Sequence, residues 1–287
     1  MNNCRRWLLC CVCAAFALSV QFARAIDGLE FQGIWRQGGM IVGRVAPTAR
    51  VTFAGKSVPV APDGHFVVGL GRDAPATVTL VVSDPLGPRR YRFDVERRSY
   101  PVQRVDGVPE STVIPPPEAL ERIRREQALV DAARAIVSDR DDFLTGFSRP
   151  LDGPITGVYG SQRIYNGVPR NPHFGLDIAA PTGTPVRAPA PGVVRLAQSD
   201  LYFSGGTLIL DHGRGLSSSF IHLSALLVRE GDQVERGDTI ARVGATGRAN
   251  GPHLDWRMNW FDVRLDPALV LQYFPVAGER TAQRLQP

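Results

Sequence analysis

Two short stretches carry residue types that bind metals. The segment GPHLDW, residues 251–256, places His253 and Asp255 two positions apart, and HFGLD places His173 four residues before Asp177. In a β-strand, residues separated by two or four positions point to the same face of the sheet. Imidazole and carboxylate groups are both zinc ligands. The pairs indicate a metal site, although a single His-x-x-x-Asp also occurs in structural settings.

The remaining histidines are weaker candidates when each is taken alone. His222 lies in SSFIHLS, whose alternation favours a strand, and taken alone it is expected to be a half-buried core residue rather than a site residue. His212, in LDHGRG, is expected in a turn rather than at a metal. His65, in PDGHFVV, is expected at the start of a strand. Gly175 lies between His173 and Asp177, and its lack of a side chain keeps the face that they share open.

The elements that must position these residues are short strands. From residue 151 to about 270 the chain consists of β-rich runs such as GGTLILDHG and DTIARVGATG, separated by glycine-rich turns. A helix is expected only at DPALVLQYF. This pattern predicts an all-β unit large enough to bury its own core.

The preceding region predicts a second, smaller β unit and a linker. Residues 26–105 contain alternating runs spaced by turns such as APDG and DPLG, the pattern of a small, Ig-like β-sandwich. Residues 106–150 form a proline-rich linker with a helix from Glu118 to about Asp139. We expect this helix to lie on one of the domains; a partner-binding helix is the alternative. Residues 271–287 are expected to be a tail.

The first 25 residues have the organisation of a signal peptide. Arg5 and Arg6 precede an apolar run of about 14 residues, short of the ~20 that span a bilayer, and Ala23-Arg24-Ala25 follows. We expect cleavage after Ala25 and export to the periplasm or medium, without a stable membrane span. All four cysteines lie in this segment, so the mature chain is expected to lack disulfides and thiol chemistry.

Composition limits the choice of partners. The whole chain has 33 basic and 28 acidic residues, and without the first 25 residues 30 basic and 28 acidic residues remain. A net charge near +2 gives no support for nucleic-acid binding. The 44% of apolar residues is typical of a globular protein.

The order of the motifs resembles a known family. HFGLD, GTPVRAPAPGVV, LILDHGRG, FIHLS, GDQVERGDTIARVGATG and GPHLDW follow one another as in the lysostaphin/LytM-type zinc metallopeptidases. The resemblance covers about residues 151–268. It implies an antiparallel β barrel-sandwich hybrid fold with a groove, and an activity against peptide cross-links of peptidoglycan.

The resemblance also implies roles for individual residues. His173 and Asp177 match the first two zinc ligands, His222 matches a histidine near the metal-bound water, and His253 matches a catalytic histidine. The third zinc ligand falls on Asp255, where the family has the second histidine of a His-x-His motif. Tyr165 and Asn166, in the loop before His173, are candidate substrate-binding residues. One zinc ion per chain is expected.

The aspartate at position 255 leaves the activity open. Two carboxylates would cancel the charge of a zinc ion and polarise its water less than a site with two histidines. We expect Asp255→His to keep or raise zinc affinity and Asp255→Ala to abolish it. The leading hypothesis is a zinc endopeptidase acting on peptidoglycan stem or cross-bridge peptides. The alternatives are a catalytically degenerate envelope factor, which binds cell wall or activates a separate hydrolase such as an amidase, and a metal-free carbohydrate- or peptide-binding β-sandwich.

Overall fold

The N-terminal region is built from two antiparallel sheets that face each other. The computed structural model describes residues 29–105 and 115–277, so the expected signal peptide lies outside the described residues. Phe31 and Phe93 come from different sheets, and both contact Trp35. The ring centroid of Trp35 is 5.7 Å from that of Phe31 and 3.9 Å from that of Phe93. Aromatic packing between the sheets therefore forms this part of the core. The strands are β1 (Glu30–Gly33), β2 (Met40–Arg44) and β5 (His65–Gly69) in one sheet, and β3 (Arg50–Phe53), β4 (Lys56–Val58), β6 (Thr77–Asp84) and β7 (Gly87–Asp94) in the other.

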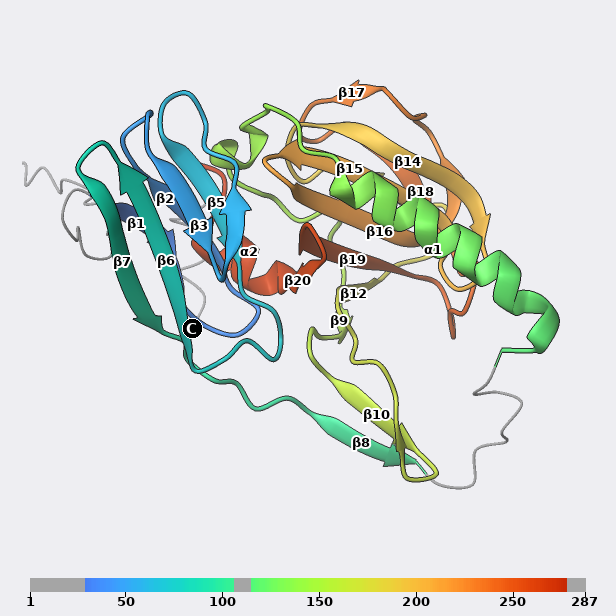
Figure 1. The fold of residues 1–287 in the computed structure, drawn as a ribbon. Helices are drawn as coiled ribbons and strands as arrows, with labels where there is room; N and C mark the ends of the chain where they lie inside the picture. Colours follow the sequence, from blue (N-terminus) through green and yellow to red (C-terminus); the bar gives the residue numbers. More distant parts are fainter. Residues whose placement is uncertain (1–28, 106–114, 278–287) are drawn as a thin grey trace, which may run out of the picture.

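The predicted mainly β architecture is confirmed, while the Ig-like comparison stays a prediction. His65 begins β5 as expected, and its Nδ1 lies 2.7 Å from Asp63 Oδ2. Figure 1 shows these two sheets beside a larger one, which is formed by the second half of the chain.

A small third sheet connects the two regions. Strand β8 (Val102–Val105) runs parallel to β10 (Gln162–Tyr165), which forms a hairpin with β11 (Val168–Pro169). The hairpin extends away from the large sheet (Figure 1). Its base leads directly into His173, because Ser161 O accepts a hydrogen bond from His173 N at 2.8 Å and Gly160 N donates to His173 O at 2.7 Å.

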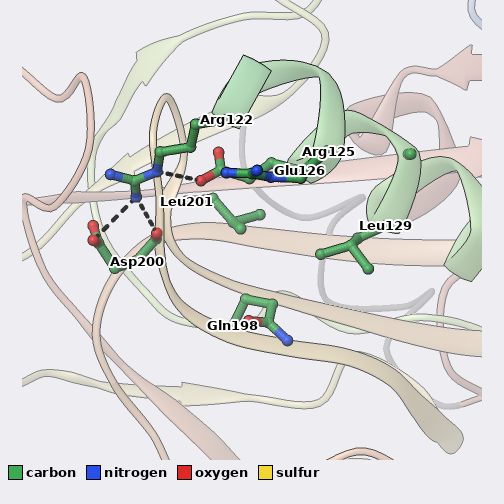
Figure 2. A pocket seen from close by; sticks show the side chains of 8 residues that line it. Arg122, Arg125, Glu126, Leu129, Gln198, Asp200 and Leu201 are labelled. Carbon is green, nitrogen blue, oxygen red and sulfur yellow. Dashed lines mark hydrogen bonds and ion pairs between the residues drawn. The ribbon is translucent and has the colours of Figure 1, made fainter. Parts of the chain in front are cut away.

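The linker helix lies on the large sheet. A 3₁₀ turn (Pro117–Ala119) precedes α1 (Leu120–Ala135), whose buried Ala133 packs with Leu196, Leu201 and Ile209. At the other end of the helix, Arg122 donates to Glu126 and to Asp200 (Figure 2). Glu126 in turn accepts a hydrogen bond from Tyr202 N at 2.7 Å. The helix is therefore fixed along its length to one surface of the sheet.

This helix ends earlier than the sequence suggested. It stops at Ala135 instead of continuing to Asp139, and Ile136 is extended. The residues after the helix contact Arg214. Its backbone N donates a hydrogen bond to Ser138 O, and its guanidinium donates to the Asp139 carboxylate. Contacts with the sheet thus override the helical composition of residues 136–139.

The large sheet holds ten strands and carries Asp177, His222, His253 and Asp255, while His173 lies just before β12. Its central path runs β17-β14-β15-β16-β19-β12-β9, so the sequence-distant β12 and β19 are neighbours. The expected C-terminal helix is α2 (Pro267–Tyr273), capped by the Asp266 side chain. The strands are β9 (Ile155–Gly157), β12 (Leu176–Ala179), β13 (Pro185–Arg187), β14 (Gly192–Leu201), β15 (Gly205–Gly213), β16 (Leu216–Leu226), β17 (Gln233–Val234), β18 (Thr239–Val243), β19 (His253–Trp260) and β20 (Val263–Leu265).

One hydrophobic core joins the N-terminal sheets to the large sheet. Phe53 of β3 contacts Trp260 of β19 with ring centroids 6.0 Å apart. Beside them, Arg98 Nη1 forms a 2.7 Å ion pair with the buried Asp266. Most buried apolar residues of both regions belong to one cluster, and a smaller cluster lies between α1 and the large sheet.

His212 is a structural residue, but not in the way expected. It lies near the end of β15 rather than in a turn, and it is fully buried. Its Nδ1 lies 2.7 Å from Pro191 O and its Nε2 lies 2.8 Å from Ser218 Oγ. Burial lowers the pKa of the His212 imidazole, so both nitrogens are used in the neutral ring.

Candidate metal centre

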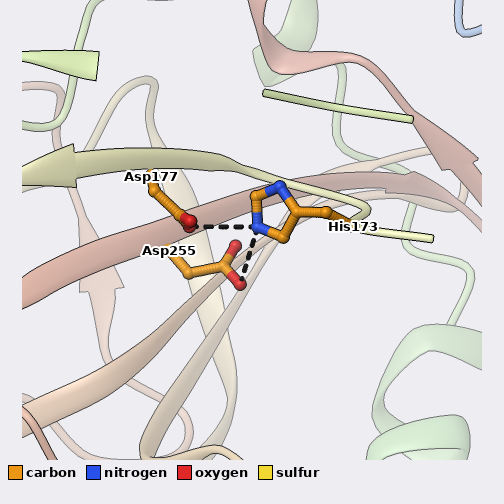
Figure 3. A group of neighbouring side chains, drawn as sticks. All are labelled: His173, Asp177 and Asp255. Atoms are coloured by element: carbon orange, nitrogen blue, oxygen red, sulfur yellow. Dashed lines mark hydrogen bonds and ion pairs between the residues drawn. The ribbon is translucent and has the colours of Figure 1, made fainter. Parts of the chain in front are cut away.

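Two adjacent strands bring the three predicted ligands together. Asp177 of β12 and Asp255 of β19 are direct cross-strand partners, so their side chains leave the sheet on the same face. His173 precedes β12 and reaches the same point (Figure 3). The expectation of a strand spanning both His173 and Asp177 is wrong, because the strand begins only at Leu176.

The distances suit a tetrahedral zinc ion. His173 Nε2 lies 3.0 Å from Asp177 Oδ1 and 3.3 Å from Asp255 Oδ2. Ligand atoms of the three residues all lie within 4.8 Å of one another. Ligands about 2.1 Å from a tetrahedral zinc are about 3.4 Å apart. Asp177 Oδ1 is buried and its close polar contact is with His173 Nε2, another of the three candidate ligands, so the donor set and its geometry fit a metal.

The histidine rings are oriented by backbone carbonyls. Nδ1 of His173 lies 3.2 Å from Val158 O, and Nδ1 of His253 lies 2.8 Å from Gly251 O. Nδ1 of His222 lies 2.8 Å from Thr246 O. A proton on Nδ1 in each ring leaves a lone pair on Nε2, the arrangement seen in metal-binding and proton-accepting histidines.

His222 reaches this group through an irregular backbone. Its φ is +66°, in the left-handed region that non-glycine residues rarely adopt. Ile221 pairs with Asp255 across the strands, so in a regular strand His222 would point to the opposite face. The left-handed residue interrupts the alternation, and the His222 ring lies 4.9 Å from the His253 ring. The predicted strand at His222 is confirmed, but simple alternation would have placed the His222 side chain on the wrong face.

Two glycines make room for the carboxylates. A Cβ atom on Gly175 would lie 1.9 Å from Asp255 Oδ1, and one on Gly157 would lie 2.1 Å from Asp177 Oδ2. These positions therefore exclude any side chain while the carboxylates keep their orientation. The open face that Gly175 was expected to provide is occupied by the Asp255 carboxylate.

Arg257 belongs to the site and was not found from the sequence. Its Nη2 lies 2.6 Å from Asp255 Oδ2, and its Nε lies 3.0 Å from both Asp255 oxygens. The signal was present, because Arg257 follows Asp255 by two positions in the same strand. Arginine is not a metal ligand, so a pattern of ligand residue types does not include Arg257.

The charges in this group are strongly coupled. Burial alone would lower the pKa of His173, but contact with the carboxylates of Asp177 and Asp255 outweighs burial and raises this pKa to about 10. Burial alone would raise the pKa of Asp255, but Arg257 and His173 hold it well below its ordinary range. Without a metal, the His173 ring is thus protonated at neutral pH, and a metal must displace that proton.

His222 differs from His173 in its electrostatics. Burial lowers the pKa of the His222 imidazole. The ring is therefore neutral near pH 7 and can accept a proton at Nε2. His253 Nε2 lies 3.9 Å from Asp177 Oδ1, so the two catalytic candidates adjoin the ligand group.

The candidate substrate-binding residues lie at the far end of the β10–β11 hairpin. Tyr165 ends β10 and its hydroxyl is 3.3 Å from Arg163 Nη1, and Asn166 follows in the turn with a φ of +49°. In Figure 1 this end of the hairpin points away from β19. A role in substrate binding stays a prediction.

The fold and site define a β-sheet domain with a His/Asp metal-ligand group flanked by two further histidines. Residues 171–267 match the model of Peptidase family M23. A crystal structure of a Pseudomonas aeruginosa protein assigned to the M23 peptidases shares 36% sequence identity, with a TM-score of 0.65, over 82% of this chain and 94% of that one. The chain belongs to peptidase family M23, which confirms the resemblance predicted from the motif order.

Curated relatives match over part of this chain. Peptidoglycan DD-endopeptidase ShyA of Vibrio cholerae is 40% identical over 122 residues, which are 41% of this chain and 28% of ShyA. Cell division protein DipM of Caulobacter vibrioides is 32% identical over 165 residues, which are 55% of this chain and 26% of DipM. The matches thus span between a quarter and a third of these relatives.

Proposed function

We propose that this protein is an exported zinc endopeptidase that hydrolyses peptide bonds in peptidoglycan stem or cross-bridge peptides. The observation that carries the proposal is the convergence of His173, Asp177 and Asp255, with ligand atoms within 4.8 Å, beside the paired rings of His222 and His253. ShyA, a relative by sequence, is named a peptidoglycan DD-endopeptidase. That name supports the substrate class.

The roles of the residues follow from their geometry. His173, Asp177 and Asp255 would hold one zinc ion, which when bound activates water and polarises the scissile carbonyl. His222 and His253 both have Nδ1 directed to a backbone carbonyl. Their Nε2 atoms can therefore accept a proton from the nucleophile or, once protonated, donate a hydrogen bond to the developing oxyanion.

Digestion of purified peptidoglycan tests this function. The wild type is expected to release new muropeptides, detected by mass spectrometry, and to contain about one zinc per chain by elemental analysis. His173→Ala is expected to lose both properties. His65→Ala removes a histidine of β5, outside the site, and serves as the matched control. Identical products from the wild type and His173→Ala would reject the peptidase.

The second candidate is a catalytically degenerate envelope factor. The ion pair between Asp255 and Arg257, which engages both carboxylate oxygens, favours this alternative because the arginine competes with a metal for the carboxylate. The relation to a cell division protein is compatible with it. Under this alternative, the protein would bind peptidoglycan without cutting it, and an amidase would be activated through α1. An amidase assay with and without added protein separates the two functions.

Export is proposed from the N-terminal sequence. In the parts of the chain that the structure describes, no helix is both long and apolar enough to span a bilayer. Periplasmic or secreted location is expected because residues 1–25 have signal-peptide organisation. Cell fractionation, with the N-terminus of the mature protein determined by sequencing, tests this.

A further inference from the structure

The ion pair between Asp255 and Arg257 has a consequence for the charge of the site. Asp255 is 2% exposed, and Arg257 contacts both of its oxygens. A buried carboxylate needs such a partner, since an unpaired buried charge is strongly destabilising. The carboxylate and the guanidinium together carry no net charge.

The charge count explains how an aspartate can occupy this place. With Asp177 and a free Asp255 carboxylate as ligands, the protein would contribute −2 against the +2 of a zinc ion. Arg257 restores one positive charge, so the occupied site would carry about +1, the value for one carboxylate and two neutral imidazoles. We infer that Asp255 and Arg257 act as one unit that replaces a neutral histidine ligand, with Arg257 as a positioning residue. This inference rests on the proposed zinc site.

The geometry allows Asp255 to serve both partners. Oδ2 accepts from Arg257 Nη2 at 2.6 Å and still faces His173 Nε2 at 3.3 Å. A carboxylate oxygen has two lone pairs, so one can face the arginine while the other faces the ligand centre. The close approach of Asp255 Oδ1 to the backbone at Gly175 fixes the carboxylate from the other side.

The surroundings of Arg257 make its pairing with Asp255 necessary. Ser219, its cross-strand partner, accepts a 3.1 Å hydrogen bond from Arg134 Nη2 of α1. Arg264 projects from the neighbouring β20 and contacts Asn259, two residues beyond Arg257. Burial lowers the pKa of Arg134 and of Arg264, and the positive charge of Arg257 adds to the lowering of both. Asp255 is the carboxylate that pairs with Arg257, so its loss would leave this guanidinium beside two like charges without that partner.

A histidine at position 255 is therefore not equivalent to a histidine in the usual motif. Asp255→His would leave Arg257, whose side chain is 26% exposed, without its carboxylate partner beside a divalent cation. This reverses the expectation from the sequence that the substitution keeps or raises zinc affinity, because that expectation did not include Arg257. The His-x-His pattern becomes functional only when Arg257 is also replaced by a neutral side chain.

A double-mutant cycle tests the inference. Zinc dissociation constants are measured by competition with a chromophoric chelator for wild type, D255H, R257M and D255H/R257M, with circular dichroism as the control for folding. D255H is expected to bind zinc at least about tenfold more weakly than wild type. R257M is expected to bind it about tenfold more tightly, and the double variant within about threefold of wild type.

R257K keeps the positive charge and is expected to bind zinc within about threefold of wild type. If D255H does not fold, the comparison of R257M with R257K decides. Equal affinities of D255H and the double variant, or of R257M and R257K when D255H is unfolded, would overturn the inference and leave the proposed function standing. No zinc binding by wild type would overturn both.

Discussion

At the scale of single residues, the site depends on a glycine, because a side chain at position 175 would overlap a carboxylate. Gly175 has no Cβ, and the Asp255 carboxylate fills the space where one would be. The backbone there cannot move away freely, because the segment is fixed between the base of the hairpin at His173 and β12 at Leu176. A methyl group would therefore displace Asp255 before it displaced the backbone.

We predict that Gly175→Ala weakens zinc binding by at least about tenfold, because a displaced ligand loses much of its bond energy to the ion. Calorimetric titration of the metal-free protein with zinc measures the effect. Gly71→Ala is the matched control, since the nearest atom to a Cβ at Gly71 is 3.7 Å away. Unchanged zinc affinity in Gly175→Ala would contradict the assignment of Asp255 as a ligand.

The sequence predicted which side chains meet, but not how each one reaches the site. Motif order and even spacing were enough to group His173, Asp177 and Asp255, because cross-strand pairing preserves faces. The left-handed backbone at His222 has no signal in FIHLS, since the pattern alternates in the usual way. The spacing places Arg257 on the same face as Asp255, but its importance depends on the contact with the buried Asp255 carboxylate, which only the fold reveals.

At the scale of elements, α1 is part of the large sheet's packing rather than a free linker. Its composition predicted a helix, and the structure confirms one that begins with Leu120. The end of the helix could not be predicted, because Arg214, in the turn between β15 and β16, contacts the residues that follow the helix. The sheet face that α1 covers includes Ser219, the cross-strand partner of Arg257.

We predict that Ala133→Glu detaches α1 from the sheet. The substitution places a carboxylate against Leu196 and Ile209, which costs about 2 kcal/mol when no hydrogen-bond partner is available. Limited proteolysis should then cut within residues 120–135 faster than in wild type. Arg125→Ala changes an exposed position of the same helix and is the control. Equal cleavage rates for Ala133→Glu and Arg125→Ala would show that Ala133 does not hold the helix.

At the scale of the whole molecule, the two β regions share one core. The sequence predicts two β units, over residues 26–105 and 151–270, and that division stays a prediction. What the sequence could not show is the contact between them, because Phe53 and Trp260 are about 200 residues apart and no local pattern links them. The buried ion pair of Arg98 with Asp266 adds to the same junction.

We predict that the metal-free protein unfolds in a single cooperative transition. The apolar cluster is continuous from β1 to α2, so neither region can open without exposing core residues of the other. Differential scanning calorimetry is expected to show one peak, with equal calorimetric and van't Hoff enthalpies. Two resolved peaks would show that the regions unfold independently.

The position of the tryptophans on β19 gives the molecule an optical reporter. Trp256 lies between Asp255 and Arg257 and is fully buried, and Trp260 lies at the junction with Phe53. An indole in such apolar surroundings emits at shorter wavelength than one in water. Together with Trp35, these indoles make the emission of the unlabelled protein sensitive to the strand that carries Asp255 and to the contact between the two β regions, without any attached dye.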